Sequence, residues 1–264
     1  MTLSRWQLFN IAFRSILLQA SWNYRGMMSM GFLYSIAPGL DSIYEEGPDR
    51  EMAYMRHFEY FNTNPYFGSV VMGVTLALEE KLHDGDKVVD PEMIHNTKEA
   101  LMTSLAAIGD GLFWDSWRPF VAVFALVFAS GNYMLTPFIF LALYNIPHLY
   151  FRFAGIYWGY DDGMNVIKKL KQFQFPQIRQ TLRMGTLVLL AYLIPNHVNV
   201  HTPFLLANLP LEYFYFGEKV VQGFGALALV ALGTYAYRQK VNVLLISFLL
   251  LIFALVLYHW GILI

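Results

Sequence analysis

Residues 241–264 read VNVLLISFLLLIFALVLYHWGILI and contain no Asp, Glu, Lys or Arg. A helix needs about 20 predominantly apolar residues to cross a hydrocarbon core about 30 Å thick. The alternative, a buried core helix of a soluble protein, seldom stays uncharged over such a length. The stretch therefore predicts a transmembrane helix.

The composition of the whole chain also favours a membrane location. Of its 264 residues, 56% are hydrophobic and 14% are charged, whereas a soluble domain is about 25% charged. The mean hydropathy is +0.41 and the formal net charge is −1, so no basic field favours nucleic acid as a partner. The chain has no Cys, which excludes a disulfide scaffold and Cys-ligated zinc.

Four further apolar stretches precede the last one. Residues 219–237 are rich in Gly and Ala, which allow close helix packing in lipid. Residues 184–210 are interrupted by prolines and predict either one kinked span or a re-entrant pair. Residues 117–131 and 134–158 also contain prolines, and broken helices at membrane depth usually line a cavity or pack inside protein.

The N-terminal half of the chain mixes apolar and polar residues. Its apolar run at residues 66–78 is too short to cross a bilayer and suits a re-entrant hairpin or an amphipathic helix. Residues 92–108 predict an amphipathic helix that starts at Asp90-Pro91.

We therefore expect an all-α, polytopic membrane protein that forms a single unit over residues 1–264. Residues 1–116 are expected to contain re-entrant or broken helices and a polar candidate site. Residues 117–264 are expected to contain regular transmembrane helices, with a cytoplasmic loop at residues 160–183.

Basic residues predict the orientation in the membrane. The positive-inside rule places the segment 160–183 in the cytoplasm, because it contains Lys168, Lys169, Lys171, Arg179 and Arg183. Arg238 and Lys240 favour the same side, and two crossings between the clusters put the N-terminus in the cytoplasm and the C-terminus outside. If both clusters only mark helix ends, the orientation stays open.

The most polar stretch beside an apolar run is Arg56-His57-Phe58-Glu59-Tyr60-Phe61-Asn62-Thr63-Asn64-Pro65. Asn and Thr before Pro favour an irregular backbone, and amides offer both donors and acceptors, which suits sugar hydroxyls. The alternative is a turn that caps the following helix.

Glu79-Glu80 directly follows the short apolar run. A carboxylate at membrane depth is costly and is a functional candidate, and it accepts hydrogen bonds from hydroxyl groups strongly. The alternative is that both carboxylates lie in water at a helix end.

Asp110 lies between Gly109 and Gly111, which predicts a tight turn. There Asp110 caps the next helix or pairs with Arg118. The seven His residues have no recognised metal-ligand spacing, and His197 and His201 are flanked by prolines. No phosphate-binding loop and no nucleophile motif is present. We therefore expect no catalytic residue, no metal and no cofactor, a pattern that favours a transporter over an enzyme.

Several polar blocks resemble the enzyme IID subunits of mannose/fructose/sorbose-family sugar phosphotransferase systems. The blocks fall in family order across about residues 20–163. They are Ser21-Trp22-Asn23-Tyr24, Gly31-Phe32-Leu33-Tyr34-Ser35-Ile36-Ala37-Pro38, Arg56-His57 with Phe61-Asn62-Thr63-Asn64-Pro65, Ala77-Leu78-Glu79-Glu80, Asp90-Pro91-Glu92, Gly109-Asp110-Gly111-Leu112-Phe113-Trp114 with Arg118-Pro119, and Asn145-Ile146-Pro147 with Arg152 and Gly159-Tyr160.

The resemblance implies a non-catalytic, multi-pass subunit of the bacterial cytoplasmic (inner) membrane, surrounded by membrane lipid. It implies a IIC membrane partner, with which the chain forms the translocation unit for a hexose or hexosamine-type sugar. Soluble IIA and IIB phosphocarriers would phosphorylate the sugar as it enters, and IIC–IID pairs would assemble as trimers of heterodimers.

The resemblance also implies residue roles. The sugar-facing candidates are Asn62, Thr63, Asn64, Glu79 and Glu80. The supporting candidates are Arg56, His57, Asp110 and Asn23.

Departures from the family pattern leave the sugar open. They occur at Arg25-Gly26, Lys81 and Ser104-Leu105. The alternatives are a stand-alone membrane channel or enzyme, a receptor without a transport role, and a divergent transporter subunit without coupling to phosphorylation.

Overall fold

The computed structural model describes residues 2–128, 134–197 and 231–259. Regular structure within these ranges is helical, apart from isolated bridges that join Met27 to Asn23 and to Phe61. The all-α prediction is therefore confirmed. The chain divides into two compact units, residues 1–185 and 186–264, and each is described by itself. The expectation of a single functional unit stays a prediction.

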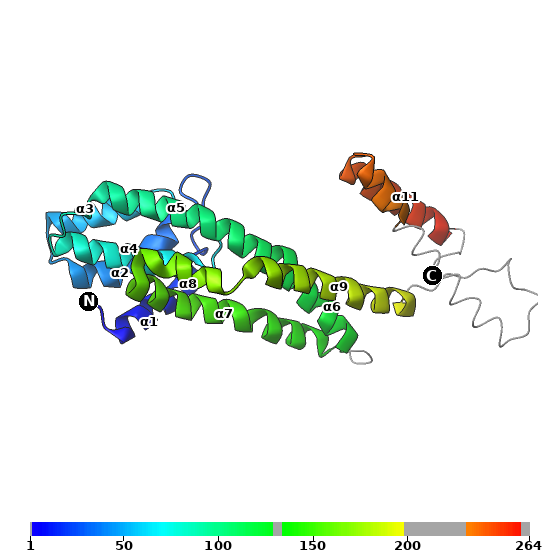
Figure 1. The fold of residues 1–264 in the computed structure, drawn as a ribbon, viewed down its shortest axis with the longest axis horizontal. Coiled ribbons are helices and arrows are strands. Elements are labelled where there is room, and N and C mark those ends of the chain that lie inside the picture. Colours follow the sequence, from blue (N-terminus) through cyan, green and yellow to red (C-terminus); the bar gives the residue numbers. More distant parts are fainter. Residues whose placement is uncertain (1, 129–133, 198–230, 260–264) are drawn as a thin grey trace, which may run out of the picture. The chain divides into compact units, whose positions relative to one another are not determined.

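The first unit is built from helices joined by short connections (Figure 1). They are α1 (Arg5–Arg14), α2 (Ser29–Ile43), α3 (Pro48–His57), α4 (Gly68–His83), α5 (Pro91–Gly109), η2 (Asp110–Trp117), α6 (Arg118–Phe128), α7 (Thr136–Asp162) and α8 (Val166–Gln172), with short turns η1 (Ser15–Leu17) and η3 (Gly163–Asn165). Helix α9 (Phe175–His197) crosses into the second unit, which also contains α11 (Val243–His259).

Local sequence signals explain where two of these helices start. The Asp90 side chain accepts a hydrogen bond from the backbone N–H of Met93, and Pro91 occupies the first turn of α5. Both features favour a helix N-terminus, so the predicted start at Asp90-Pro91 is confirmed. Ser4 and Gln7 form a capping box at α1.

Helix α4 lies at the centre of the first unit, against α2, α5 and α7. The predicted short apolar run at residues 66–78 forms most of this buried helix, which extends to His83. At 16 residues it is about 24 Å long, so it remains too short to span a hydrocarbon core.

Three glycines let α4 and α7 approach closely. A Cβ added at Gly73 would lie 2.3 Å from the Ile156 carbonyl oxygen, and one at Gly159 would lie 2.3 Å from the Val70 carbonyl oxygen. Gly155 lies one turn before Gly159 and faces Ser69 and Val70. This spacing of small residues brings helix backbones together in membrane proteins.

Helix α5 continues through η2 into α6 as one helical stretch. Among the residues described, Pro91–Phe128 is the one helix of 38 residues that is long and apolar enough to cross a membrane. The predicted turn at Gly109-Asp110-Gly111 is wrong, because the chain remains helical there with π-type geometry. Such wide turns within α-helices frequently occur at functional sites.

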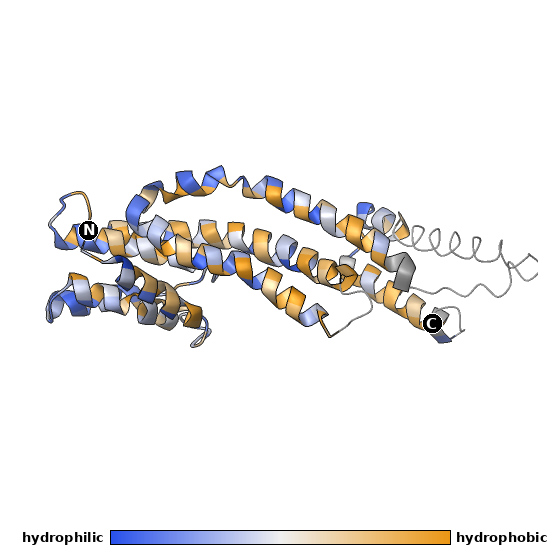
Figure 2. Ribbon diagram, turned by 90° about the horizontal axis from the view of Figure 1, so that it is seen from below, coloured by the Kyte–Doolittle hydropathy of each residue, from blue (hydrophilic) through white to orange (hydrophobic). Residues whose placement is uncertain are grey.

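Segment 160–183, expected to be a loop, is instead mostly helical. Asp162 ends α7, and the basic side chains lie on α8 and the first half of α9. The segment is therefore more regular than a loop of irregular backbone, while its role as a cytoplasmic connection between spans stays a prediction. Figure 2 shows hydrophilic residues along α8 and largely hydrophobic residues in α6.

In the second unit, α11 covers 17 residues of the predicted C-terminal span. Its side chains are largely exposed; Leu244, for example, is 78% and Phe248 58% exposed. An apolar helix with this exposure is typical of contact with lipid. Residues 198–230 and 260–264 lie outside the described ranges. Most of the predicted span 219–237 therefore lies outside them. So does the part of 184–210 that would distinguish one kinked span from a re-entrant pair.

Candidate functional site

Glu79 on α4 is the centre of a buried hydrogen-bond network. Its side chain is 0% exposed. Arg56 donates from Nε to Oε1 and from Nη2 to Oε2, both at 2.9 Å. His57 Nε2 lies 2.7 Å from Oε1, and the Tyr44 hydroxyl donates to Oε2 at 2.7 Å. Four donor atoms from α3 and from the end of α2 therefore surround one carboxylate.

This environment keeps Glu79 ionised. Burial alone raises the pKa of Glu79, but the hydrogen bonds from His57 and Arg56 and the charge of Arg56 outweigh burial and lower it to about 2. Burial lowers the pKa of His57, against the opposing effect of Glu79. At neutral pH a neutral imidazole therefore donates its Nε2–H to an ionised Glu79.

Two polar groups around this network have few partners. With Nε2 donating, the His57 Nδ1 lone pair faces inward and has no hydrogen-bond partner among the described residues. Lys98 on α5 is 3% exposed, and its Nζ donates to the Arg56 carbonyl oxygen at 3.3 Å. A buried ammonium beside an arginine is costly without a counter-charge, and the ionised Glu79 supplies negative charge nearby.

Glu80 faces different partners from Glu79. It accepts hydrogen bonds from Tyr160 on α7 and from the backbone N–H and hydroxyl of Thr2. The Tyr160 hydroxyl in turn accepts from the Leu3 N–H at 3.1 Å. The two consecutive glutamates therefore bind different segments of the chain, and Glu80 joins the N-terminal segment to Tyr160 of α7.

The loop between α3 and α4 is fastened through its side chains. Thr63 Oγ1 donates to the Met102 carbonyl oxygen at 2.9 Å. Asn64 Nδ2 donates to Asp110 Oδ1 at 2.9 Å, and Asn64 Oδ1 accepts from the Tyr66 N–H at 3.1 Å. Asn64 and Thr63 are buried, whereas Asn62 is exposed.

Asn64 also packs directly on the helix that contains Asp110. A Cβ at Gly109 would lie 2.4 Å from the Asn64 Cβ, so only glycine leaves room for the loop here. Asp110 neither caps the next helix nor pairs with Arg118; its carboxylate accepts from Asn64, and Arg118 lies over the Trp114 ring. Both roles expected for Asp110 are therefore wrong.

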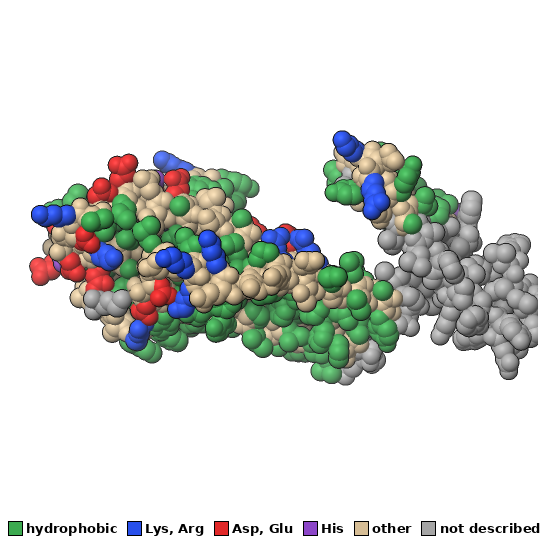
Figure 3. All heavy atoms as spheres, viewed as in Figure 1, with side chains coloured by type: hydrophobic (Ala, Val, Ile, Leu, Met, Phe, Trp, Pro, Cys, Tyr) green, Lys and Arg blue, Asp and Glu red, His purple; other side chains and the backbone are tan. Residues whose placement is uncertain are grey.

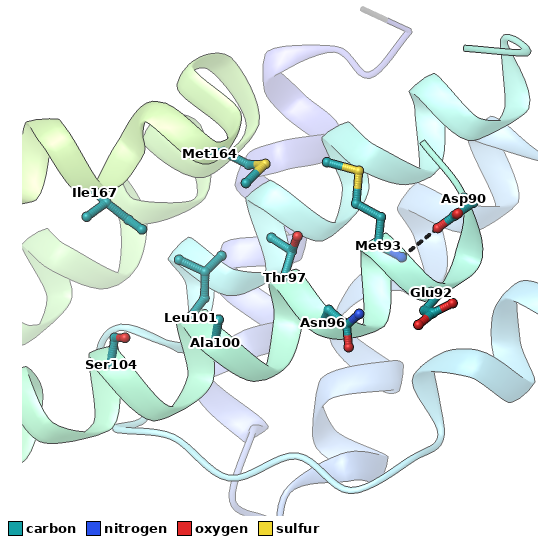
Figure 4. A pocket seen from close by; sticks show the side chains of 10 residues that line it. All are labelled: Asp90, Glu92, Met93, Asn96, Thr97, Ala100, Leu101, Ser104, Met164 and Ile167. Atoms are coloured by element: carbon teal, nitrogen blue, oxygen red, sulfur yellow. Dashed lines mark hydrogen bonds between the residues drawn. The ribbon is translucent and has the colours of Figure 1, made fainter. Parts of the chain in front are cut away.

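A cavity of about 490 Å³ lies along α5 (Figure 4), and another of about 780 Å³ lies beside the Glu79 network. The second cavity contains two of the supporting candidates, Asn23 and Arg56, but none of the five sugar-facing candidates. It is lined by Asn23, Arg25, Gly26, Ser29, Met30, Met55, Arg56, Phe58, Glu59 and Tyr60. Its volume is in the range of small-molecule sites.

The chain segments around this cavity meet through backbone hydrogen bonds. Met28 N–H donates to the Phe61 carbonyl oxygen at 2.8 Å, and Phe61 N–H donates to the Gly26 carbonyl oxygen at 3.3 Å. Asn23 Oδ1 closes the first loop by accepting from the Gly26 N–H at 2.8 Å. Sequence reasoning missed Arg25, because nothing local to it indicates that its loop packs beside Arg56.

Charged side chains concentrate at the end of the first unit that includes α3, whereas hydrophobic side chains cover much of α6 and α7 (Figure 3). The candidate residues lie on α3, α4 and η2 and in the loops that precede α2 and α4. The arrangement offers an amide, guanidinium groups and aromatic rings to a polar ligand.

Comparison with known proteins identifies the family of the chain. Residues 2–263 match the model of the PTS system mannose/fructose/sorbose family IID component. The chain is 32% identical over 197 residues to the PTS system mannose-specific EIID component of Escherichia coli strain K12, a match that covers 74% of this chain and 69% of that one.

Two solved structures are also similar. One, described as a membrane protein, has a TM-score of 0.79 and 27% identity, covering 100% of this chain and 99% of that one. The other, from a cryo-EM complex of the mannose transporter ManYZ with a microcin, has a TM-score of 0.59 and 28% identity, covering 99% and 98%. The chain therefore belongs to the IID components of the mannose/fructose/sorbose family of the phosphotransferase system, which are membrane subunits of sugar transport.

Proposed function

We propose that this IID chain pairs with a IIC membrane subunit and that the pair moves a hexose or hexosamine-type sugar across the bacterial cytoplasmic membrane. IIA and IIB phosphocarriers phosphorylate the sugar on entry, and the pairs assemble as trimers of heterodimers. The likeness to a chain of the mannose transporter ManYZ complex supports the IIC partnership. The basic segment 160–183 supports a cytoplasmic N-terminus and an external C-terminus.

We further propose that the sugar site involves Asn62, Thr63, Asn64, Glu79 and Glu80. The observation that carries this proposal is the buried, ionised Glu79, which accepts hydrogen bonds from Arg56 and His57 and so fixes the end of α3 and hence the Asn62–Asn64 loop. Asn62 is the exposed member of the loop and contacts sugar hydroxyls. Glu79 and Asn64 hold the loop in place, and Glu80 secures α4 against the N-terminal segment.

We also propose that the N-terminal half enters the membrane as re-entrant or broken helices. Helix α4 is too short to span a membrane and is buried along most of its length, which suits a segment that enters the bilayer inside protein. The IIC partner completes the enclosure on the side where Asn62 is exposed.

Uptake of radiolabelled hexoses tests the function. Cells that express the chain together with a IIC partner should accumulate sugar, and cells that lack either protein should not. Asn62→Ala should reduce uptake by at least about tenfold, since a sugar hydroxyl enclosed between the chain and its IIC partner would lose a hydrogen bond worth about 1.5 kcal/mol or more. Asn10→Ala, on the exposed surface of α1, is the matched control and should leave uptake unchanged.

Each alternative function predicts a different result. A stand-alone channel or enzyme would be active from this chain alone in liposomes. A receptor without a transport role would leave uptake unchanged in both Asn62→Ala and Glu79→Ala. Failure to co-purify any membrane partner in mild detergent would contradict the proposed IIC pairing.

A further inference from the structure

A groove runs between α5 and α8, away from the Glu79 network. It consists of two adjoining cavities of about 490 and 360 Å³ that share Leu101, Ser104 and Ile167 as lining residues. Figure 4 shows the first, outer cavity, with α5 on one side and Met164 and Ile167 on the other. We refer to both cavities together as the α5/α8 groove.

The second, inner cavity is almost entirely apolar. Leu105 and Ile108 line it from α5, Leu170 lines it from α8, and Phe175 and Pro176 close it at the start of α9. Its α5 wall belongs to Pro91–Phe128, the stretch of membrane-spanning length. The groove therefore joins a helix able to enter the hydrocarbon core to the basic segment that follows α7.

Two lysines of α8 lack charged partners among the described residues, and one of them, Lys171, lines the groove. Lys168 and Lys171 are both exposed, and neither forms an ion pair with a carboxylate in the described part of the chain, whereas the neighbouring Lys169 binds Asp162 at 2.8 Å. Residues three apart lie on the same side of a helix, so the two ammonium groups of α8 are neighbours. Lys171 also lines the inner cavity.

The opposite end of the groove has the opposite charge. Asp90 and Glu92 line the outer cavity at the start of α5, as Figure 4 shows. An anionic headgroup is repelled there and attracted to Lys168 and Lys171. The two lysines fit a phosphate, and the apolar lining fits an acyl chain. Both features therefore favour an elongated ligand with an apolar tail and a phosphate at one end.

We propose that the α5/α8 groove binds an anionic phospholipid, with one acyl chain in the inner cavity and the phosphate at Lys168 and Lys171. Basic pockets beside membrane helices attract anionic lipid headgroups, and the apolar lining removes the acyl chain from water. A helix of a partner protein is the rival occupant, and it would have to supply its own carboxylates to pair with the two lysines. The proposal depends on the membrane location of the chain and does not depend on the sugar site.

Native mass spectrometry of the full-length chain in dodecyl maltoside tests the proposal. The probes are phosphatidylglycerol and phosphatidylcholine with identical acyl chains. The wild type should bind phosphatidylglycerol at least about tenfold more tightly, the effect expected from two lysines near a lipid surface. Lys168→Gln/Lys171→Gln should abolish that preference, and the control Lys81→Gln/Lys87→Gln, which removes two exposed lysines outside the groove, should retain it.

A second pair of variants tests the groove itself. Ser104→Phe fills the inner cavity without altering charge and should reduce binding of both lipids. Thr103→Phe places the same ring on the neighbouring exposed position of α5, which does not line the groove, and should leave binding unchanged. If Ser104→Phe fails to fold, the lysine variants still decide the headgroup site, because both lysines lie on the surface.

Three outcomes would overturn the proposal. The first is equal binding of the two lipids by the wild type, and the second is full preference for phosphatidylglycerol in the Lys168→Gln/Lys171→Gln variant. The third is loss of a co-purifying membrane protein in Ser104→Phe with lipid binding unchanged, which would assign the groove to a protein helix. Millimolar inorganic phosphate should not displace the lipid, since a free phosphate gains nothing from the apolar cavity. Loss of sugar uptake has no bearing on any of these results.

Discussion

Arg56 and Glu79 form a two-pronged ion pair in which both N–O distances are 2.9 Å, and the side chains are 15% and 0% exposed, respectively. The pair joins the last turn of α3 to the buried helix α4. Planar, two-pronged geometry is the strongest form of this interaction, and burial makes the loss of one partner costly.

Removal of Arg56 should therefore destabilise the protein strongly. Arg56→Met leaves the Glu79 charge buried with fewer donors and should lower the free energy of unfolding by about 3–5 kcal/mol. The double variant Arg56→Met/Glu79→Met should recover part of this loss, because no charge then remains unpaired. Reversible unfolding in mixed detergent and SDS, followed by tryptophan fluorescence, measures both effects.

Arg50→Met is the matched control for that prediction. Arg50 contacts Asp41 and Glu46 at 3.6 Å, and both carboxylates are largely exposed. Such surface pairs contribute about 0–1 kcal/mol. Equal destabilisation by Arg50→Met and Arg56→Met would contradict the importance of the buried pair.

Acidification should reduce stability in two stages. The pKa of His57 is lowered by burial, so the unfolded chain takes up the proton first and stability falls as the pH drops below the usual value of 6.5. The pKa of Glu79 is lowered to about 2, so its contribution is lost as the pH falls from 4.5 towards 2. Thermal midpoints from pH 8 to pH 3 test both stages.

Glu79→Gln provides the control for the pH dependence. The glutamine has no charge to lose, so the decline below pH 4.5 should become shallower than in the wild type. An unchanged slope in Glu79→Gln would assign the acid sensitivity to other carboxylates.

Substitution of Gly73 should disrupt the contact between α4 and α7. An added Cβ would lie 2.3 Å from the Ile156 carbonyl oxygen and 2.7 Å from the Tyr160 N–H nitrogen, and backbone atoms cannot move aside as a side chain can. Gly73→Ala should therefore lower the free energy of unfolding by about 1–3 kcal/mol or more. Gly47→Ala is the control, because no atom lies within 4 Å of its added Cβ, and it should leave stability within about 0.5 kcal/mol of the wild type.

The contact between Asn64 and Asp110 predicts a functional effect. Asp110→Ala removes the acceptor of the Asn64 amide at 2.9 Å and releases the loop that contains Asn62, so sugar uptake should fall by at least about fivefold, equivalent to a lost hydrogen bond of about 1 kcal/mol. Asp115→Ala is the control, since its carboxylate lies on the surface 3.9 Å from Arg183. Equal uptake by Asp110→Ala and Asp115→Ala would show that the Asn62–Asn64 loop does not contribute to transport.

Sequence signals with a local cause predicted much of the fold. Asp90-Pro91 starts α5 because a side-chain cap and a proline act within one helical turn. The uncharged run 241–264 predicts a helix, and α11 lies within it. This prediction needs only the hydropathy of consecutive residues. The polar blocks around Asn62 and Glu79 identified the family by resemblance, and the family model matches residues 2–263.

Other features depended on contacts between distant segments. Gly109-Asp110-Gly111 resembles a turn, but the helix continues there because Asn64, 46 residues away from Asp110, packs on Gly109 and binds the carboxylate. The glycine pair on α7 reveals no partner until Gly73 of α4 lies against it. The sequence contains Gly155 and Gly159 but does not indicate that the backbone of α4 packs against them.

Glu79 and Glu80 show the difference between what the sequence determines and what the tertiary structure determines. The sequence by itself determined that two carboxylates lie at the end of an apolar run, and that they require donors if they are buried. Only the tertiary structure decided that Glu79 binds Arg56 and His57 while Glu80 binds Thr2 and Tyr160. The physical reason is that consecutive helix residues point about 100° apart, so each carboxylate meets whichever distant segment packs on its own side of α4.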